Sequence, residues 1–208
     1  MLKTAGHVKK NFKIVCAIFE DFLKKGGQGA TLREFISEVE RYANGIEDED
    51  QRNTFKGDML EILAEMFFKA FENSPEVGLR NYTPVPLDED YGVDAHGNNA
   101  TGHECAVQVK YRANPMDFVT YAEIARTYTS GRIQLELDLD ADDSIFVFTT
   151  AIGVTVQCQN VLKKRLRVIN RENISREIDN NVSFWQMAYD EVKETLLGKV
   201  RPRSSSQR

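Results

Sequence analysis

The sequence predicts an α/β fold in which helices flank a mixed β-sheet, and three stretches carry this prediction. Residues 54–73 have apolar side chains on most sides of a helix, which indicates a buried helix. Residues 104–111 place apolar side chains on one face and mainly polar ones on the other, as a strand between two different layers does. Residues 144–150, SIFVFTT, form a short apolar run that is typical of a buried strand.

Further segments complete the order of elements around these three. Residues 77–85 predict a strand, and residues 115–129 predict a helix. From residue 54 the predicted order is therefore helix, three strands, helix, strand. A last amphipathic helix is predicted over residues 182–197.

Two amphipathic helices are predicted before this core. The first covers residues 8–25, and the second begins at Thr31, which has the spacing of a capping box with Glu34. The acidic segment 46–53 lacks apolar periodicity and is predicted to be a linker. We therefore expect three parts, which are a helical extension over residues 1–50, a main domain over residues 51–200 and a basic disordered tail over residues 201–208.

The composition is that of an ordinary globular protein. Of the 208 residues, 41% are hydrophobic and 28% are charged, and the net charge of −5 means that any contact with nucleic acid must come from a local basic patch. The three cysteines lie far apart without metal-binding spacing, which predicts free thiols in a reducing compartment. Since no stretch resembles a membrane span or a signal peptide, we expect a cytoplasmic protein without a membrane partner.

Residues 91–112 predict the β-hairpin around which a functional site is expected. Its first strand is predicted to end at Asp94, and a polar loop rich in glycine and asparagine follows over residues 96–103. The alternating run described above forms the second strand, on which Gln108 and Lys110 point to the same face. The end of the partner strand then brings Asp94 beside these two side chains.

A carboxylate, an amide oxygen and an ammonium at one point suit the hydrolysis of a phosphodiester. Asp94 supplies a hard oxygen ligand of the kind that Mg²⁺ prefers, and the side-chain oxygen of Gln108 supplies a neutral one. Lys110 can orient or help deprotonate an attacking water, or neutralise the charge that builds on a phosphate. The motif therefore predicts catalytic roles for these three residues.

The residues Gly-Val-Asp94 and Gln108-Val-Lys110 resemble the PD-(D/E)XK nuclease superfamily. The signature of this superfamily is an aspartate at a strand end, followed by (D/E/Q)-x-K on the next strand. Gln108 stands where most members have an acidic residue, and Val93 stands where the name-giving proline would be.

The resemblance extends to the preceding helix, where many members carry Gly-x-x-x-Glu and this chain has Gly57 and Glu61. It implies a restriction-endonuclease-like αβββαβ core and makes Glu61 a fourth catalytic residue. It also implies Mg²⁺ as the cofactor, with Mn²⁺ able to substitute, held by the side chains of Asp94, Gln108 and Glu61 and by the carbonyl of Val109. The implied function is a metal-dependent DNA endonuclease of the restriction, homing or junction-resolving type, and double-strand cutting implies a homodimer.

Basic residues for contact with DNA are expected in two places. Residues 156–169 are predicted to form a basic helix, for which a merely solvated face is the alternative. By family resemblance, the predicted helix 115–129 is the second place, with the candidate contact residues Thr120, Glu123, Arg126 and Thr127. The residues predicted to bind DNA are Lys163, Lys164, Arg165, Arg167, Arg112 and Arg126.

Two other classes of function stay open. A nuclease fold with Gln108 in place of an acid can be an inactive DNA-binding module, which would bind DNA without metal-dependent cleavage. A protein-interaction protein, docking through its terminal helices, would do neither and would tolerate Lys110→Ala.

Overall fold

The computed structural model describes residues 2, 11–26, 29–86 and 92–198 of the chain. These residues form an α/β fold with a mixed sheet between helices, as the sequence predicts. The strands of the main sheet, in their order across it, are β1 (Leu79–Pro84), β2 (Ala95–Asn99), β3 (Glu104–Lys110), β5 (Ile145–Thr149) and β7 (Leu166–Ile169). The pairs β1–β2 and β2–β3 are antiparallel, whereas β3, β5 and β7 run parallel to one another.

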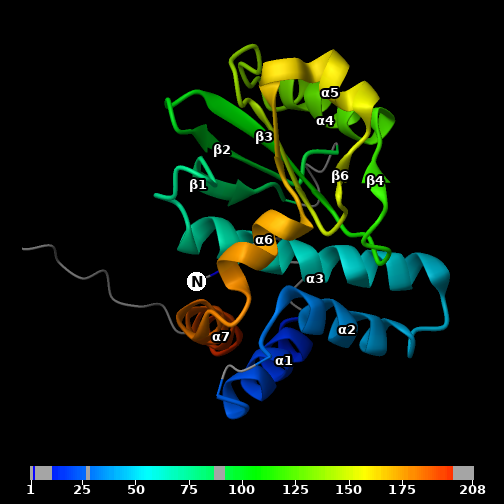
Figure 1. Ribbon diagram of the computed structural model, residues 1–208, viewed down its shortest axis with the longest axis vertical. Coiled ribbons are helices and arrows are strands. Elements are labelled where there is room, and N and C mark those ends of the chain that lie inside the picture. The colour runs from blue at the N-terminus through cyan, green and yellow to red at the C-terminus, as the bar shows by residue number, and fades with distance from the viewer. Residues whose placement is uncertain (1, 3–10, 27–28, 87–91, 199–208) are drawn as a thin grey trace, which may run out of the picture.

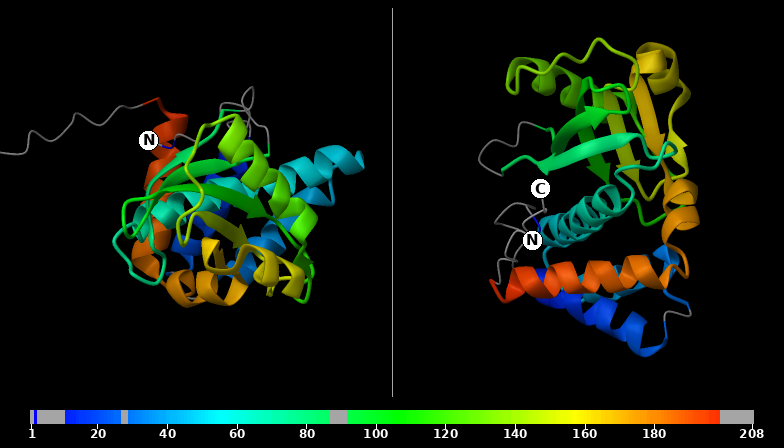
Figure 2. Two further views of the ribbon diagram at one scale, coloured as in Figure 1. Left: turned by 90° about the horizontal axis from the view of Figure 1, so that it is seen from above. Right: turned by 90° about the vertical axis from the view of Figure 1, so that its left-hand side faces the viewer.

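Helices cover both faces of this sheet. The long helix α3 (Glu49–Ala70) crosses one face, and α4 (Tyr121–Ile133) and α5 (Val156–Leu162) cover the other (Figure 1). A further layer lies on the far side of α3, as Figure 2 shows, and consists of α1 (Phe12–Lys24), α2 (Leu32–Ala43) and α7 (Val182–Leu196). Helix α6 (Arg171–Ile178) connects β7 to this layer and contacts α2.

One buried cluster runs from the sheet through α3 into the terminal helices. Because α3 lies between two layers, it buries side chains on nearly all sides. This confirms the prediction of a largely buried helix. In the outer layer, Trp185 packs against Phe19, Phe22 and Phe184, with ring centroids 5.0 to 5.4 Å apart. Its indole N–H donates to the carbonyl of Ala30 at 2.8 Å, which ties α7 to the start of α2.

Strand β3 separates two environments in the way that its alternation predicts. Cys105, Val107 and Val109 belong to the cluster that α3 covers. Ala106 belongs to a different buried cluster, and Gln108 contacts Thr127 of α4 on the opposite face. Because successive side chains of a strand point to opposite faces, the side chain of Gln108 points away from the main core and toward α4.

The predicted linker over residues 46–53 is wrong. Helix α3 begins at Glu49, and its N-cap Asp48 accepts a hydrogen bond from the backbone N–H of Gln51 at 2.7 Å. Acidic residues in the first turn of a helix are stabilised by the helix dipole, so this segment favours a helix start without any apolar periodicity. The predicted boundary at residue 50 consequently falls inside α3, and the predicted tail over 201–208 lies outside the described residues.

The predicted loop over residues 96–103 is wrong in its first half, because residues 95–99 form β2. This strand lies between β1 and β3 and pairs with both, so its backbone groups are used despite a sequence poor in β-favouring residues. Gly97 is required here, since a Cβ atom at this position would lie 2.6 Å from the carbonyl oxygen of Arg80. Asp94 therefore stands directly before a strand instead of at the end of one.

Two predicted helices differ from those observed. The helix predicted over 115–129 begins at Tyr121 and ends at Ile133, after the two-residue strand β4 (Phe118–Val119), which pairs with β6 (Gly153–Val154). The helix predicted over 156–169 ends as α5 at Leu162, continues as a 3₁₀ turn over 163–165 and becomes strand β7. Apolar spacing over so few residues does not separate a helix from a strand, and pairing with β5 decides the outcome.

The other predicted elements are confirmed within the described residues. Thr31 caps α2 by accepting a hydrogen bond from the backbone N–H of Glu34, and residues 79–84 and 145–149 form strands as expected. Among the helices that the structure describes, none has the length and apolarity needed to cross a membrane.

Candidate active site

The predicted motif residues meet where β2 begins and β3 ends. The last residue pair between these strands is Ala95 with Val107, so the backbone of Val109 lies beyond the end of the ladder. Its N–H donates instead to the Asp94 carboxylate at 2.5 Å. The side-chain amide nitrogen of Gln108 donates to the same carboxylate oxygen. By the alternation of β3, the carbonyl of Val109 also points to this open edge.

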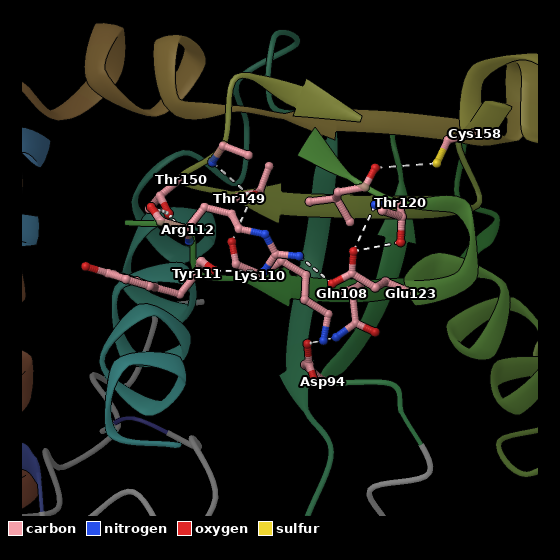
Figure 3. A network of polar contacts seen from close by, with 12 residues as sticks. Asp94, Gln108, Lys110, Tyr111, Arg112, Thr120, Glu123, Thr149, Thr150 and Cys158 are labelled. Carbon is pink, nitrogen blue, oxygen red and sulfur yellow. Dashed lines mark hydrogen bonds and ion pairs between the residues drawn. The ribbon is translucent and has the colours of Figure 1, made fainter. Parts of the chain in front are cut away.

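Lys110 lies at the carboxyl end of β3, and its backbone is held firmly. Its carbonyl accepts hydrogen bonds from the hydroxyl of Thr149 at 2.7 Å and the N–H of Thr150 at 3.4 Å. The side chains of Asp94, Gln108 and Lys110 point toward one another (Figure 3). A half-buried ammonium therefore stands next to the carboxylate on a rigid strand.

Two cavities meet at Asp94 and Lys110, one on each side of the strand end. The cavity toward α4 has a volume of about 440 Å³ and is also lined by Gln108, Glu123 and Arg126. The cavity toward α3 has a volume of about 430 Å³. Asp94 and Lys110 thus line cavities on both faces of the sheet, whereas Gln108 lines only the cavity toward α4.

Glu61 of α3 lies in the second cavity, together with Gly57, as the helix motif predicts. Burial, followed by the negative charges of Glu61, Glu65 and Asp94, raises the pKa of Tyr82 well above its usual value. The three carboxylates are thus close enough to act on Tyr82, while the cavity itself is lined by the carboxylates of Glu61 and Asp94 and by the basic side chains of Lys56, Lys110 and Arg112.

On the α4 side, Gln108 is held by a buried threonine. Thr127 is 0% exposed and Gln108 only 2% exposed. The hydroxyl of Thr127 lies within hydrogen-bond reach of the side-chain oxygen of Gln108 and of the carbonyl of Gly92, at 2.9 Å from the latter. The prediction that Thr127 is an exposed contact residue for DNA is therefore wrong.

Gly92, two residues before Asp94, has a backbone conformation that favours glycine. Its φ is +95°, and a Cβ atom here would lie 2.8 Å from the side chain of Arg126. The exposed Arg126 consequently lies against the backbone of the loop and lines the cavity on the α4 side. The contact with DNA predicted for Arg126 stays a prediction.

Arg112 is held inside the site by an ion pair with Glu123 of α4. Burial alone would raise the pKa of Glu123, but hydrogen bonds from Thr120 and Arg112 outweigh it and lower that pKa. Thr120 and Glu123 also form the capping box that starts α4. Thr120 and Glu123 were predicted as DNA contacts, and the structure uses both to fix the helix beside Lys110.

The second N-terminal helix also reaches the site. Glu40 of α2 accepts a hydrogen bond from the hydroxyl of Tyr111 at 2.7 Å and pairs with Lys56 of α3, also at 2.7 Å. Burial and the hydrogen bond to Glu40 raise the pKa of Tyr111, so this hydroxyl stays protonated. Lys56 and Tyr111 line the cavity that contains Glu61.

The predicted basic run lies elsewhere. This run lies next to Leu166, which pairs with Ile145 at the amino end of β5. Lys110 pairs with Thr149 at the carboxyl end of β5. Ile145 and Thr149 are four residues apart, so the two ends are separated by ~13 Å at the usual rise of a strand. Lys163 and Lys164 are exposed there. Arg165 pairs with Asp140 at 3.4 Å and Arg167 with Asp143 at 3.1 Å. The structure thus brings Arg112 and Arg126 to the motif, and does not bring the other four predicted DNA-binding residues there.

The oxygen atoms at this edge are suitable ligands for a hard cation. Asp94 and Glu61 supply carboxylates, Gln108 an amide and Val109 a backbone carbonyl. Within the described part of the chain, no three His, Cys, Asp or Glu side chains cluster tightly enough to hold a metal. A cation here would therefore depend on the neutral donors and on water, which Mg²⁺ accepts readily.

No family model matches the sequence, and comparisons with curated proteins and with solved structures found no similar protein.

Proposed function

We propose that the protein is a metal-dependent deoxyribonuclease with a restriction-endonuclease-like core. The observation that carries this proposal is the meeting of Asp94, Gln108 and Lys110 at one strand end, with Glu61 in the adjoining cavity. The αβββαβ order of α3, β1, β2, β3, α4 and β5, apart from the short β4, supports the same assignment.

Mg²⁺, or Mn²⁺ in its place, would be held by the oxygens of Asp94, Glu61, Gln108 and Val109. When bound, such a cation supplies positive charge to the phosphate and lowers the pKa of a water ligand. A charge-neutral Gln108 leaves only two carboxylates in this set, which makes the binding of the cation weaker than at a site with three.

Lys110 would orient the attacking water and offset charge on the phosphate. The hydrogen bonds from Thr149 and Thr150 fix its backbone, so little ordering of the strand is needed when a substrate binds. Arg126 in one cavity and Lys56 in the other could contact phosphates on either side of the cleaved bond. A homodimer would bring two such sites to the two strands of a duplex.

The test is cleavage of supercoiled plasmid, linear duplex and a four-way junction with Mg²⁺, Mn²⁺ or EDTA. Wild type should cut with either metal and not with EDTA. Lys110→Met should lower the rate by about 10² to 10³-fold, in the range found when one transition-state donor is removed. Lys13→Met, an exposed lysine on α1, is the matched control and should cut at the wild-type rate. The substrate that is cut fastest would distinguish between endonucleases of the restriction, homing and junction-resolving types.

One observation favours the alternative of an inactive DNA-binding module. The amide nitrogen of Gln108, and not its oxygen, faces Asp94, so in this orientation the amide contributes no ligand. Binding of DNA without cleavage under any metal condition would support that alternative. A protein that neither binds nor cuts these substrates would contradict both readings.

A further inference from the structure

Thr127 has one hydroxyl proton and two oxygen acceptors within reach. One acceptor is the carbonyl of Gly92 and the other is the side-chain oxygen of Gln108. A threonine hydroxyl donates a single hydrogen bond but can also accept from a donor. With the amide oriented as it is, one of these two contacts must therefore bring oxygen against oxygen without a proton between them.

Turning the Gln108 amide by half a turn removes this conflict. The amide nitrogen and oxygen have similar sizes, so both orientations fit the same buried space. In the turned orientation the nitrogen of Gln108 donates to Thr127, and Thr127 donates to Gly92. The side-chain oxygen of Gln108 then faces the carboxylate of Asp94, which is favourable only when a cation lies between them.

The surroundings of Thr127 keep it in place for this exchange. The capping box of Thr120 and Glu123 fixes the start of α4. Further along the helix, a Cβ atom at Gly131 would lie 3.3 Å from the Cβ of Ala106 on β3, so helix and strand are in close contact. The hydroxyl therefore stays beside Gln108 in either orientation of the amide.

We propose that Thr127 is a positioning residue that turns the Gln108 amide oxygen toward a cation at Asp94. Without a cation, Gln108 donates to Asp94 and closes the ligand set. With a cation, the Thr127 hydroxyl accepts a hydrogen bond from the Gln108 amide nitrogen and donates one to the carbonyl of Gly92. This inference rests on the proposed metal-dependent function and adds the residue that makes a neutral glutamine usable as a ligand.

The test measures the binding of metal instead of activity. Thr127→Val keeps the shape of the side chain and removes the hydroxyl, and should weaken the binding of Mn²⁺ roughly fivefold in calorimetric titration, as the loss of one hydrogen bond predicts. Thr127→Ser keeps the hydroxyl and should bind as wild type does. Circular dichroism and thermal melting in EDTA show that each variant is folded.

A second background separates positioning from a general packing effect. In Gln108→Glu protein both ends of the side chain are oxygens, so there is no amide orientation to select, and adding Thr127→Val should not weaken Mn²⁺ binding. The side-chain NH₂ resonance of Gln108, identified by its loss in Gln108→Glu protein, should shift when Mg²⁺ is added to wild type. It should shift less in Thr127→Val protein at the same Mg²⁺ concentration.

The outcomes distinguish the two proposals. If wild type binds Mn²⁺ and Thr127→Val binds it equally well, or if the loss is the same in the Gln108→Glu background, the role of Thr127 is refuted while the metal site stands. If wild type binds neither Mn²⁺ nor Mg²⁺, the metal-dependent function fails and the inference fails with it.

Discussion

The two ends of the parallel strands β3, β5 and β7 use charged residues in opposite ways. At the carboxyl end, Gln108 and Lys110 of β3 meet Asp94, which directly precedes β2, and all three line cavities. At the amino end, Arg165 and Arg167 lie two positions apart in the sequence and pair with aspartates of the loop that precedes β5. Both ends are rich in charge, but at the carboxyl end the polar side chains line cavities, whereas at the amino end arginines and aspartates pair with one another.

The backbone explains this difference. At the carboxyl end the ladder between β2 and β3 stops at Ala95 and Val107, which leaves the peptide groups of Val109 open for a side chain and a ligand. At the amino end, Arg167 donates to the carbonyls of Pro75 at 2.9 Å and Glu76 at 2.7 Å, so its guanidinium closes the edge. Basic residues that are close together in sequence can thus serve to stabilise the fold. A ligand-binding site needs a strand end whose backbone groups are not all used by the sheet.

The largest effect is expected at the carboxyl end of the parallel strands, which we call the open end; the amino end is the closed end. Asp94→Asn keeps an oxygen that can accept from Val109 and Gln108 but removes the negative charge, so the fold should persist and cleavage should fall on the order of 10³-fold. Rates with supercoiled plasmid and Mg²⁺ check this. Asp142→Asn, an exposed change in the acidic loop at the closed end, should leave the rate unchanged. An Asp94→Asn protein within tenfold of wild type would remove the distinction between the two ends.

A smaller effect is expected on stability from the ion pair of Glu123 with Arg112. The pKa of Glu123 is lowered from 4.5 in the folded protein, so its contribution is present above about pH 4.5 and is lost as the pH falls through the lower folded value. Glu123→Gln keeps the capping contacts but not the charge, and should lower the free energy of unfolding by about 1 kcal/mol at pH 7.

Urea unfolding at pH 7 and at progressively lower pH measures this effect. The difference between wild type and Glu123→Gln should shrink as the pH is lowered below about 4.5. Glu136→Gln, an exposed glutamate in a loop, is the control for loss of a negative charge. A difference that stays constant with pH would mean that the charge of Glu123 does not stabilise the site.

The smallest effect is expected for the exposed lysines at the closed end. The double change Lys163→Gln and Lys164→Gln should weaken the binding of a short duplex less than about threefold, because these residues lie away from the motif. Arg126→Gln should weaken binding more and reduce the slope of affinity against salt by about one unit, as the loss of one phosphate contact does. Fluorescence anisotropy in EDTA at several salt concentrations compares them. A larger loss from the lysine pair would place the DNA across the closed end.

Several features of the fold could be read from local sequence alone. Thr31 with Glu34 predicts the start of α2, and the alternation of residues 104–111 predicts which side chains of β3 share a face. Asp94 lies beside Gln108 as predicted, although the predicted hairpin had Asp94 at the end of a strand and the structure has it directly before one. Local signals suffice in these cases because a cap or a strand face is set by residues a few positions apart.

Other features depend on partners that are distant in the sequence. Residues 95–99 are a strand because β1 and β3 flank them, and residues 166–169 are a strand because β5 pairs with them. Thr120 and Glu123 have the spacing of a capping box, which marks the observed start of α4, whereas the helix was predicted to start at residue 115.

The sequence by itself determined the types of residue at the candidate site and their order along the chain, because strand alternation and motif spacing are local properties. Only the tertiary structure decided that Thr127 lies buried against Gln108, that Glu123 holds Arg112, and that the basic run sits at the far end of the sheet. These three facts depend on how α4 and β7 pack against the sheet. Such packing is set by contacts summed over the whole core, which no short stretch of sequence contains.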